Sequence, residues 1–176
     1  MNQKLRDLLK EKFAYAITGI NIQFDQLAIT IKPENLLEIV KYLKDDGELK
    51  YDFLEDLCGA DYPNREARFE MIYHLYSRKN NHRIRIKALL VGKNPTIDSL
   101  TGVFAGANWP ERETFDMFGI KFRNHPNMKR ILLFEEFNGF PLRKDFPVKG
   151  RERGTFPKGN VMNNKVVNAA DLLKTK

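Results

Sequence analysis

Two neighbouring segments alternate apolar and other residues with a period of two, and this pattern constrains the fold more than any other. Successive side chains of a β-strand point to opposite faces of a sheet, so such alternation predicts strands with one buried face. A turn at Asn80-Asn81 separates the segments, which predicts a β-hairpin with one face in the core and the other in water or against a partner. The inward positions are Phe69, Met71, Tyr73 and Leu75 in the first segment, and Ile84 and Ile86, between Arg83, Arg85 and Lys87, in the second.

Further elements are predicted around this hairpin. Apolar residues repeat with helical spacing in residues 2–13 and again in residues 33–47, where Pro33 occupies the first turn and Gly47 ends the helix. Residues 27–31 and 51–61 are predicted strands, and residues 14–24 are predicted to form a weak strand or a pair of short extended pieces. We therefore expect an α+β fold, a two-layer domain with a mainly antiparallel sheet and helices packed on one face.

Composition excludes several classes of protein. No apolar run approaches the length of about 18 residues that a membrane-spanning helix needs, so we expect no transmembrane segment. Asp7 and Glu11 near the start argue against a signal or transit peptide. The only cysteine, Cys58, excludes an internal disulfide, and we expect it to be a buried small hydrophobe. The net charge of +7 suits nucleic acid, an acidic membrane surface or an acidic protein partner.

The character of the chain changes at Gly139. From there proline, glycine and basic residues dominate, and such a segment buries too little apolar surface to fold alone. We expect residues 1–138 to form the α+β domain and residues 139–176 to form an extended basic strap that orders against an acidic partner. Phe146, Val148 and Phe156 are its candidate anchors. The alternative is a solvated tail.

A short capped helix is predicted over Trp109–Phe118. Asn108 is a suitable N-cap, Glu111 three residues later makes a variant capping box, and Gly119 can end the helix in the left-handed conformation. Arg112 and Asp116 share one stripe, with the cation before the anion, which is the weaker order in an isolated helix. Arg112 is therefore expected to make a tertiary contact.

The same region contains residue types that carry acid–base or metal chemistry elsewhere. Glu111 and Glu113 are two residues apart on a helix, so they point about 200° apart and cannot easily act on one substrate atom. His125 has no nearby partners at metal-ligand spacing, so we expect a hydrogen-bonded structural role. Trp109 is expected to anchor the helix in the core or at a protein interface. We predict no catalytic, cofactor-binding or metal-binding residue.

These residues resemble the signature of a known family, that of the thirty-kilodalton subunit of respiratory complex I, NADH-quinone oxidoreductase. The matching segments are Asn108-Trp109, Glu111-Arg112-Glu113, Asp116-Met117-Phe118-Gly119-Ile120, His125-Pro126, Arg130-Ile131-Leu132-Leu133 and Pro141-Leu142-Arg143-Lys144-Asp145. Three positions depart from the family pattern: Asn124 replaces a usual Gly, Phe134 a usual Pro and Phe140 a usual His. Asn can adopt the left-handed conformation that Gly permits, so the first change is mild.

The resemblance implies a cofactor-free structural subunit of the peripheral arm of a proton-translocating NADH-quinone oxidoreductase. Flavin, iron–sulfur clusters and quinone would be held by partner subunits. The partners would be the large quinone-site subunit and adjacent iron–sulfur subunits. The chain would associate peripherally with the cytoplasmic side of the bacterial inner membrane, or with the matrix side in an organelle. The docking residues implied are Trp109, Glu111, Arg112, Glu113, Asp116, His125, Arg130, Arg143, Lys144, Asp145 and Phe146.

Three other interpretations stay open. Relatives also occur in membrane-bound hydrogenases of the same ancestry, so the electron donor could differ from NADH. The basic tail and the face formed by Arg83, Arg85 and Lys87 are compatible with a nucleic-acid-binding domain, although no nucleic-acid-binding motif is visible. A stand-alone acid–base enzyme using Glu111, Glu113 and His125 is weakest, because of the helix geometry.

Overall fold

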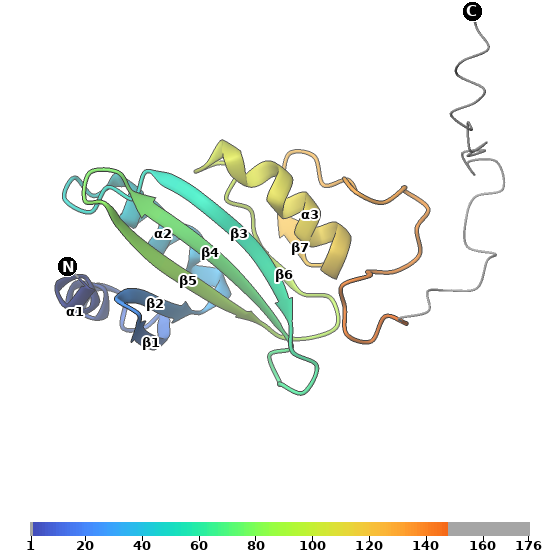
Figure 1. Cartoon of the computed structure of the whole chain (residues 1–176), viewed down its shortest axis with the longest axis horizontal. Helices are drawn as coiled ribbons and strands as arrows, with labels where there is room; N and C mark the ends of the chain where they lie inside the picture. Colours follow the sequence, from blue (N-terminus) through green and yellow to red (C-terminus); the bar gives the residue numbers. More distant parts are fainter. Residues whose placement is uncertain (1, 148–176) are drawn as a thin grey trace, which may run out of the picture.

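The computed structural model describes residues 2–147, so Val148, Phe156 and the rest of the predicted strap beyond Pro147 lie outside the described residues. The order of elements matches the prediction, with short strands β6 and β7 and two single-turn 3-10 helices added (Figure 1). The elements are α1 (Asn2–Phe13), β1 (Ile17–Gln23), β2 (Gln26–Ile31), η1 (Pro33–Asn35), α2 (Leu36–Asp45), β3 (Phe53–Asp61), β4 (Phe69–Ser77), β5 (His82–Leu90), β6 (Thr96–Asp98), η2 (Ala105–Ala107), α3 (Asn108–Phe118) and β7 (Lys121–Arg123).

The main sheet has five strands in the order β1-β2-β5-β4-β3. The predicted hairpin is present as β4 and β5, which pair from Phe69 with Leu90 to Ser77 with His82. The β1–β2 and β3–β4 pairs are also antiparallel, and only β2 runs parallel to its neighbour β5. The expected α+β fold with a mainly antiparallel sheet is therefore confirmed. The parallel β2–β5 pair arises because α2 crosses the inner face of the sheet before the chain returns through β3 and β4.

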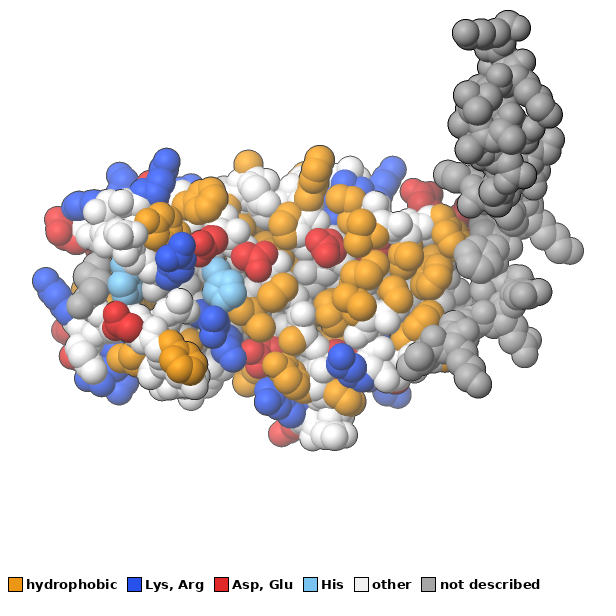
Figure 2. Space-filling model, viewed as in Figure 1, with side chains coloured by type: hydrophobic (Ala, Val, Ile, Leu, Met, Phe, Trp, Pro, Cys, Tyr) orange, Lys and Arg blue, Asp and Glu red, His pale blue; other side chains and the backbone are white. Residues whose placement is uncertain are grey.

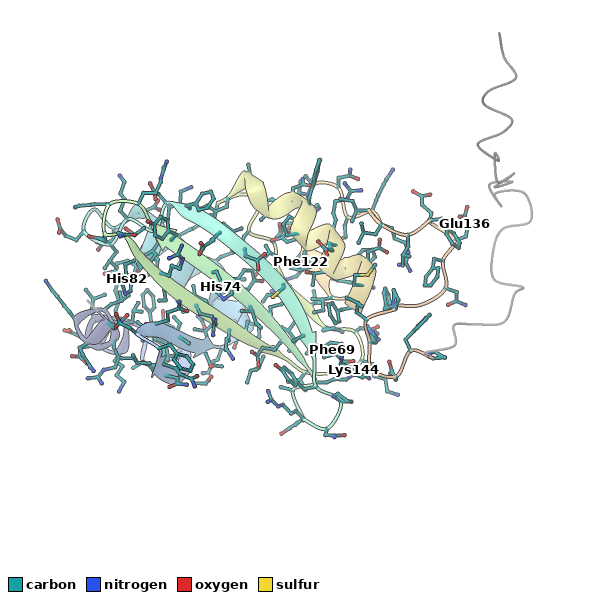
Figure 3. All side chains as sticks on the ribbon, in the orientation of Figure 1. Phe69, His74, His82, Phe122, Glu136 and Lys144 are labelled. Atoms are coloured by element: carbon teal, nitrogen blue, oxygen red, sulfur yellow. The ribbon has the colours of Figure 1, made fainter. Side chains whose placement is uncertain are left out.

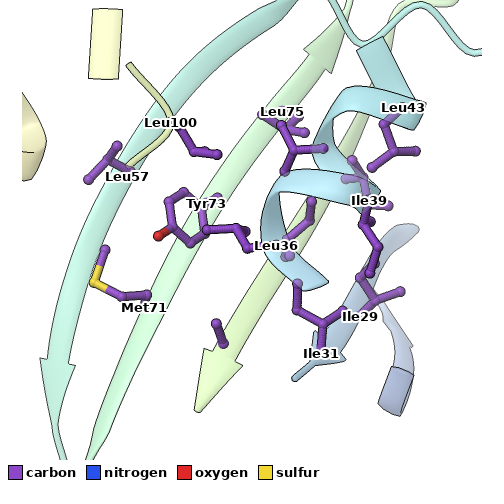
Figure 4. Close-up of a cluster of buried hydrophobic side chains, with 14 of the residues drawn as sticks. Ile29, Ile31, Leu36, Ile39, Leu43, Leu57, Met71, Tyr73, Leu75 and Leu100 are labelled. Atoms are coloured by element: carbon purple, nitrogen blue, oxygen red, sulfur yellow. The ribbon is translucent and has the colours of Figure 1, made fainter. Parts of the chain in front are cut away.

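One face of this sheet carries the core. Buried side chains of β2, β4 and β5 meet those of α1 and α2 there, including Ile29, Leu36, Ile39, Tyr73 and Leu75 (Figure 4). Every second strand residue is apolar, so each strand contributes one face to a continuous buried layer. Each Å² of apolar surface removed from water contributes about 25 cal/mol to the free energy of folding, so this layer is the main source of stability.

The helix α3 packs on the same face, at the β3 edge of the sheet. Gly59 of β3 makes this approach possible, because a Cβ there would lie 3.0 Å from Thr114 Cγ2 and 3.1 Å from Phe118 Cδ2. A Cβ at this position would force these side chains to shift by a few tenths of an ångström, so glycine permits the close contact between α3 and the strand. The helices therefore cover one face, as predicted, and within residues 2–147 the outer face lacks a covering element (Figure 2).

The expectation for Cys58 was wrong. Cys58 is exposed on β3, where it pairs with Ile72 on the face opposite the core. The acidic residues in this strand obscured its alternation. A bulge between Leu54 and Asp56 also shifts the register, so the side of each residue could not be assigned from periodicity.

Candidate functional site

The two ends of α3 differ in how well the local sequence predicts them. The helix begins at Asn108, directly after the 3-10 turn η2, and its N-cap is Ala107 without a side-chain cap. The prediction of Asn108 as N-cap was therefore wrong, because the preceding turn already continues the helical path. Gly119 ends the helix with a φ of 71°, as predicted. A Cβ at Gly119 would lie 2.5 Å from the Phe140 ring, so this residue must be glycine for packing as well as for conformation.

Glu111 does not form the predicted capping box. Its carboxylate is fully buried and accepts hydrogen bonds from Ser99 Oγ at 2.6 Å and Leu100 N–H at 2.7 Å. Burial raises the pKa of Glu111 to about 7 despite these hydrogen bonds. Glu113, by contrast, is exposed, so the two carboxylates diverge as the helix spacing predicts. Glu111 thus ties α3 to the segment after β6.

His125 fastens the segment after β7 to the start of α3. Its Nδ1 accepts from Asn127 N–H at 3.0 Å, so the proton is on Nε2, which donates to the Asn108 carbonyl at 3.1 Å. Nε2 also lies 3.9 Å from Glu111 Oε2. Both ring nitrogens are hydrogen-bonded, which agrees with the expected structural role. Asn124 directly before it has a φ of 61°, the left-handed conformation expected for that position.

Arg112 and Asp116 of α3 hold the loop that follows residue 128. Arg112 donates to the carbonyl oxygens of Lys129 at 3.0 Å and Arg130 at 2.9 Å, which is the tertiary contact predicted for it. Asp116 is fully buried, and its Oδ1 lies 2.6 Å from Arg130 Nη1. Its Oδ2 accepts three backbone N–H groups at 2.8–3.1 Å, from Ile131, Leu132 and Leu133.

The environment of Asp116 stabilises its charged form. Burial raises its pKa, but the hydrogen bonds from Leu133, Arg130 and the neighbouring N–H groups together lower it below the ordinary value. Arg130 continues the network by donating to the carbonyl oxygens of Phe137 at 2.8 Å and Gly139 at 3.1 Å. One carboxylate and one guanidinium thus fix the backbone course of residues 130–139.

An apolar hollow of about 660 Å³ lies between α3 and this loop. Trp109 and Pro110 line it from the helix, and Ile131 and Leu132 line it from the loop. Trp109 is 70% exposed and Leu132 63% exposed, so Trp109 does not anchor the helix in the core. Of the two roles expected for Trp109, only the one at a protein interface is compatible with this position.

Residues 140–147 lie against the opposite end of α3 and the ends of β3 and β4. Arg143 donates to the Phe118 carbonyl, and the ring of Phe146 stacks on Phe137 with centroids 6.0 Å apart. Lys144 lies beside Phe69 at the start of β4 (Figure 3), and its N–H donates to Asp61 Oδ2 at 2.7 Å.

Arg68 completes this contact by joining two carboxylates. It forms a double hydrogen bond to buried Asp61 at 2.7 and 2.8 Å and a further one to Asp145 at 2.9 Å. Sequence reasoning missed Asp61 and Arg68, as it missed Ser99. The only available signal was a charged residue at each end of a predicted turn, which does not identify a partner more than 70 residues away.

The structure therefore divides the predicted docking residues into two groups. The first group surrounds the hollow and its supporting loop, and the second lies at the C-terminal end of α3. Hydrophobic side chains gather on the half of the molecule that contains α3, on the right in Figure 2. The first group contains Trp109, Glu111, Arg112, Glu113, Asp116, His125 and Arg130, and the second contains Arg143, Lys144, Asp145 and Phe146.

Among residues 2–147, no helix is both long and apolar enough to cross a bilayer. No three His, Cys, Asp or Glu side chains there are grouped so that they could bind a metal ion.

Comparisons with known proteins agree on one family. Residues 29–152 match the family described as respiratory-chain NADH dehydrogenase, 30 Kd subunit. A protein of Roseiflexus castenholzii, named as a subunit of NADH-quinone oxidoreductase, is 51% identical over 137 residues, which are 78% of this chain and 79% of the relative. A protein of the same name from Citrifermentans bemidjiense is 46% identical over 145 residues, covering 82% of this chain and 89% of the relative.

Solved structures share the fold. A chain described as Nqo5, the trypsin-resistant fragment 1–134, has a TM-score of 0.61 and 27% identity, and the match covers 70% of this chain and 98% of that one. A chain from the membrane-bound sulfane sulfur reductase, an archaeal respiratory membrane complex, has a TM-score of 0.68 and 18% identity, covering 83% and 85%. The second likeness concerns the fold alone.

Proposed function

The chain belongs to the family of the 30-kDa subunit of respiratory-chain NADH dehydrogenase, and from this membership we propose the part that it plays in an NADH-quinone oxidoreductase. Its role is structural: it braces the quinone-site subunit and the adjacent iron–sulfur subunits in the peripheral arm. It carries no catalytic residue and binds no cofactor. Flavin, clusters and quinone belong to its partners, and the chain lies on the cytoplasmic side of the membrane.

The observation that carries this proposal is the hollow beside α3. Two large apolar side chains that line it, Trp109 and Leu132, are exposed, and exposed groups of this kind are typical of interface cores. Polar side chains of α3 hold both walls: buried Asp116 and partly buried Arg112 fix the loop wall, and buried Glu111 fixes the helix wall. A preformed apolar hollow loses little conformational entropy when a partner fills it.

An assembly experiment tests the proposal. The tagged chain carrying Leu132→Asp is expressed in place of the wild type, and the subunits that co-purify from detergent-solubilised membranes are identified and quantified. We expect recovery of the quinone-site subunit to fall at least about tenfold, because a buried unpaired charge at an interface costs more than about 1.4 kcal/mol. Val91→Asp is the matched control, since Val91 is 66% exposed and does not line the hollow.

Three outcomes would contradict the proposal. If the wild-type chain co-purifies with no quinone-module subunit, its assignment to this complex is wrong. If Leu132→Asp and the wild type are recovered equally, the hollow is not the docking site. Bound flavin or iron–sulfur absorption in the purified chain would contradict the cofactor-free role.

A subunit of a related membrane complex with another electron donor is the second candidate. This second candidate is supported by the fold that the chain shares with a chain of the membrane-bound sulfane sulfur reductase. The co-purifying polypeptides decide between the two, since an NADH-binding partner appears only in the first. Binding to nucleic acid gains no support, because Arg83 and Lys87 on the outer sheet face are paired with Glu55 at 2.8 Å and Glu70 at 3.0 Å.

A further inference from the structure

The main sheet ends at β1 with an edge that lacks a neighbour in the described chain. Within residues 2–147, β1 pairs only with β2. Its sequence, Ile-Thr-Gly-Ile-Asn-Ile-Gln, contains neither a charged residue nor proline, and one bulge near Ile17 distorts only its start. Edge strands are usually protected by lysine, proline or a covering segment. A long uncharged edge is therefore suited to pairing with another strand.

One side of this edge is apolar and only partly covered. Ile17, Ile20 and Ile22 pack against the core but remain partly exposed. A hollow of about 380 Å³ lies between α1 and β1, lined on one side by Lys10 of α1 and by Ala14 in the turn after it. An added strand would place alternate apolar side chains beside these isoleucines, and the Lys10 ammonium would favour an acidic residue nearby.

The turn at the end of β1 presents an exposed aromatic ring in a strained conformation. Phe24 is 91% exposed, and Phe24 and Asp25 have φ values of 50° and 57°. A two-residue turn of this kind prefers Asn-Gly, and a positive φ is a true outlier for a bulky residue. Strain of this kind persists where surrounding contacts enforce it, and it concentrates at functional positions.

A chain of hydrogen bonds beneath the turn enforces this conformation. The Asn2 amide donates to the Asp25 carbonyl at 2.9 Å and to Asp25 Oδ1 at 2.8 Å. His82 Nε2 lies 2.7 Å from Asn2 Oδ1, and the Tyr51 hydroxyl lies 2.6 Å from His82 Nδ1. Three elements, α1, β5 and the segment before β3, thus fix the turn at Asp25, the residue next to Phe24 at the end of the open edge.

We propose that the β1 edge, defined as Ile17–Gln23 with Phe24 at its end, receives an extended segment of a neighbouring subunit as an additional strand, with the Phe24 ring in an apolar pocket of that neighbour. The segment is apolar at every second position and neutral or acidic elsewhere. This inference rests on the proposed function, since it needs an assembled complex. Lys10 beside the edge favours an acidic segment over a second copy of β1, because β1 itself contains no acidic residue to pair with this ammonium.

Hydrogen exchange on the full chain, alone and in the purified complex, tests the edge directly. We expect the amides of residues 17–23 to exchange at least about tenfold more slowly in the complex, because unpaired edge amides gain partners there. The double variant Asn21→Lys with Gln23→Lys tests it by mutation, since lysines on an edge strand oppose pairing. Its recovery in the complex should fall at least about fivefold, with an unchanged circular dichroism spectrum.

The matched control places the same charges one strand further in. Gln26 pairs with Gln23 and lies beside the turn, and Thr30 lies on the same outer face, so Gln26→Lys with Thr30→Lys should assemble like the wild type. Unchanged exchange of β1 in the complex, or equal recovery of both double variants, would overturn the proposal. A dimer of the isolated chain with protected β1 amides would also overturn it, because a second copy would then occupy the edge. If Leu132→Asp blocks assembly while the edge variant does not, only the edge proposal fails.

Discussion

Asp116 offers the sharpest test of how the docking hollow is built. Its carboxylate is fully buried, contacts Arg130 at 2.6 Å and accepts three backbone N–H groups of residues 131–133. Replacement by alanine removes every one of these interactions at once. Arg130 would lose its only ion-pair partner among the described residues, and the loop wall of the hollow would lose its fixed course.

The magnitude follows from the burial of the pair. Breaking a buried ion pair by removing one partner costs about 3–5 kcal/mol. The loop residues are partly exposed, so water can replace part of the lost hydrogen bonding, and we expect the lower end, about 3 kcal/mol for Asp116→Ala. Asp116→Asn keeps one acceptor oxygen but turns an amide toward donors, so about 2 kcal/mol is expected. For a protein of this size, about 3 kcal/mol corresponds to a Tm decrease of about 6–12 °C.

The effect should also depend on pH. The folded pKa of Asp116 lies below its unfolded value, so the charge stabilises the fold above the unfolded pKa of about 3.9. That contribution is lost as the pH falls through the folded pKa. The difference in unfolding free energy between wild type and Asp116→Asn should therefore shrink below about pH 4.

Urea unfolding followed by circular dichroism at about pH 7 and about pH 3.5 measures both effects. Glu113→Gln, an exposed position on the same helix, is the control and should change stability by less than about 0.5 kcal/mol. If Asp116→Ala unfolds within about 0.5 kcal/mol of the wild type at neutral pH, the carboxylate does not hold the loop and the reasoning fails.

Three further predictions follow from other contacts. Gly119→Ala should lower stability by about 1–3 kcal/mol in thermal unfolding, because its Cβ would meet the Phe140 ring at a left-handed position; an unchanged Tm would contradict this packing. Glu111 has a folded pKa of about 7, above its unfolded value, so its ionisation destabilises the fold increasingly as the pH rises from about 4.5 to 7. The unfolding free energy of Glu111→Gln minus that of the wild type should therefore increase as the pH rises from about 5 to 8 in denaturant titrations. A difference that stays constant with pH would refute the assignment. Asp61→Asn should loosen residues 142–147, because it removes the carboxylate that accepts from Lys144 N–H and that positions Arg68, which in turn donates to Asp145. Trypsin should therefore cleave after Arg143 and Lys144 faster than in the wild type, as mass spectrometry of timed digests would show; equal cleavage rates would exclude Asp61 as the fastening group.

The strands and helices were predictable because each is encoded by neighbours in the chain. The alternation of Phe69 to Leu75 and of Ile84 to Ile86 indicated β4 and β5, and the helical spacing of Leu5, Leu9 and Phe13 indicated α1. Gly119 was identified as the end of α3 for the same reason, since its backbone requirement is local. The order of the signature residues also indicated the family before any contact was known.

Side-chain partners across the chain were not predictable in this way. Glu111 matched the pattern of a capping residue, yet it bonds Ser99 and Leu100, and Asp116 bonds a loop 15 to 17 residues away. Asp61 and Arg68 gave no sign that they fasten residues 144 and 145. These pairings depend on which elements pack together, and periodicity within one segment contains no information about its neighbours in space.

The sequence by itself determined which residues of α1, α2, β4 and β5 face the core, where the main elements lie and which family the chain belongs to. The tertiary structure alone decided that Trp109 is exposed beside a hollow, that β1 is an open edge among the described residues and that Cys58 faces outward. The physical reason is range: backbone conformation and hydrophobic periodicity are set within a few residues, whereas burial of a given side chain is set by segments that meet only after folding.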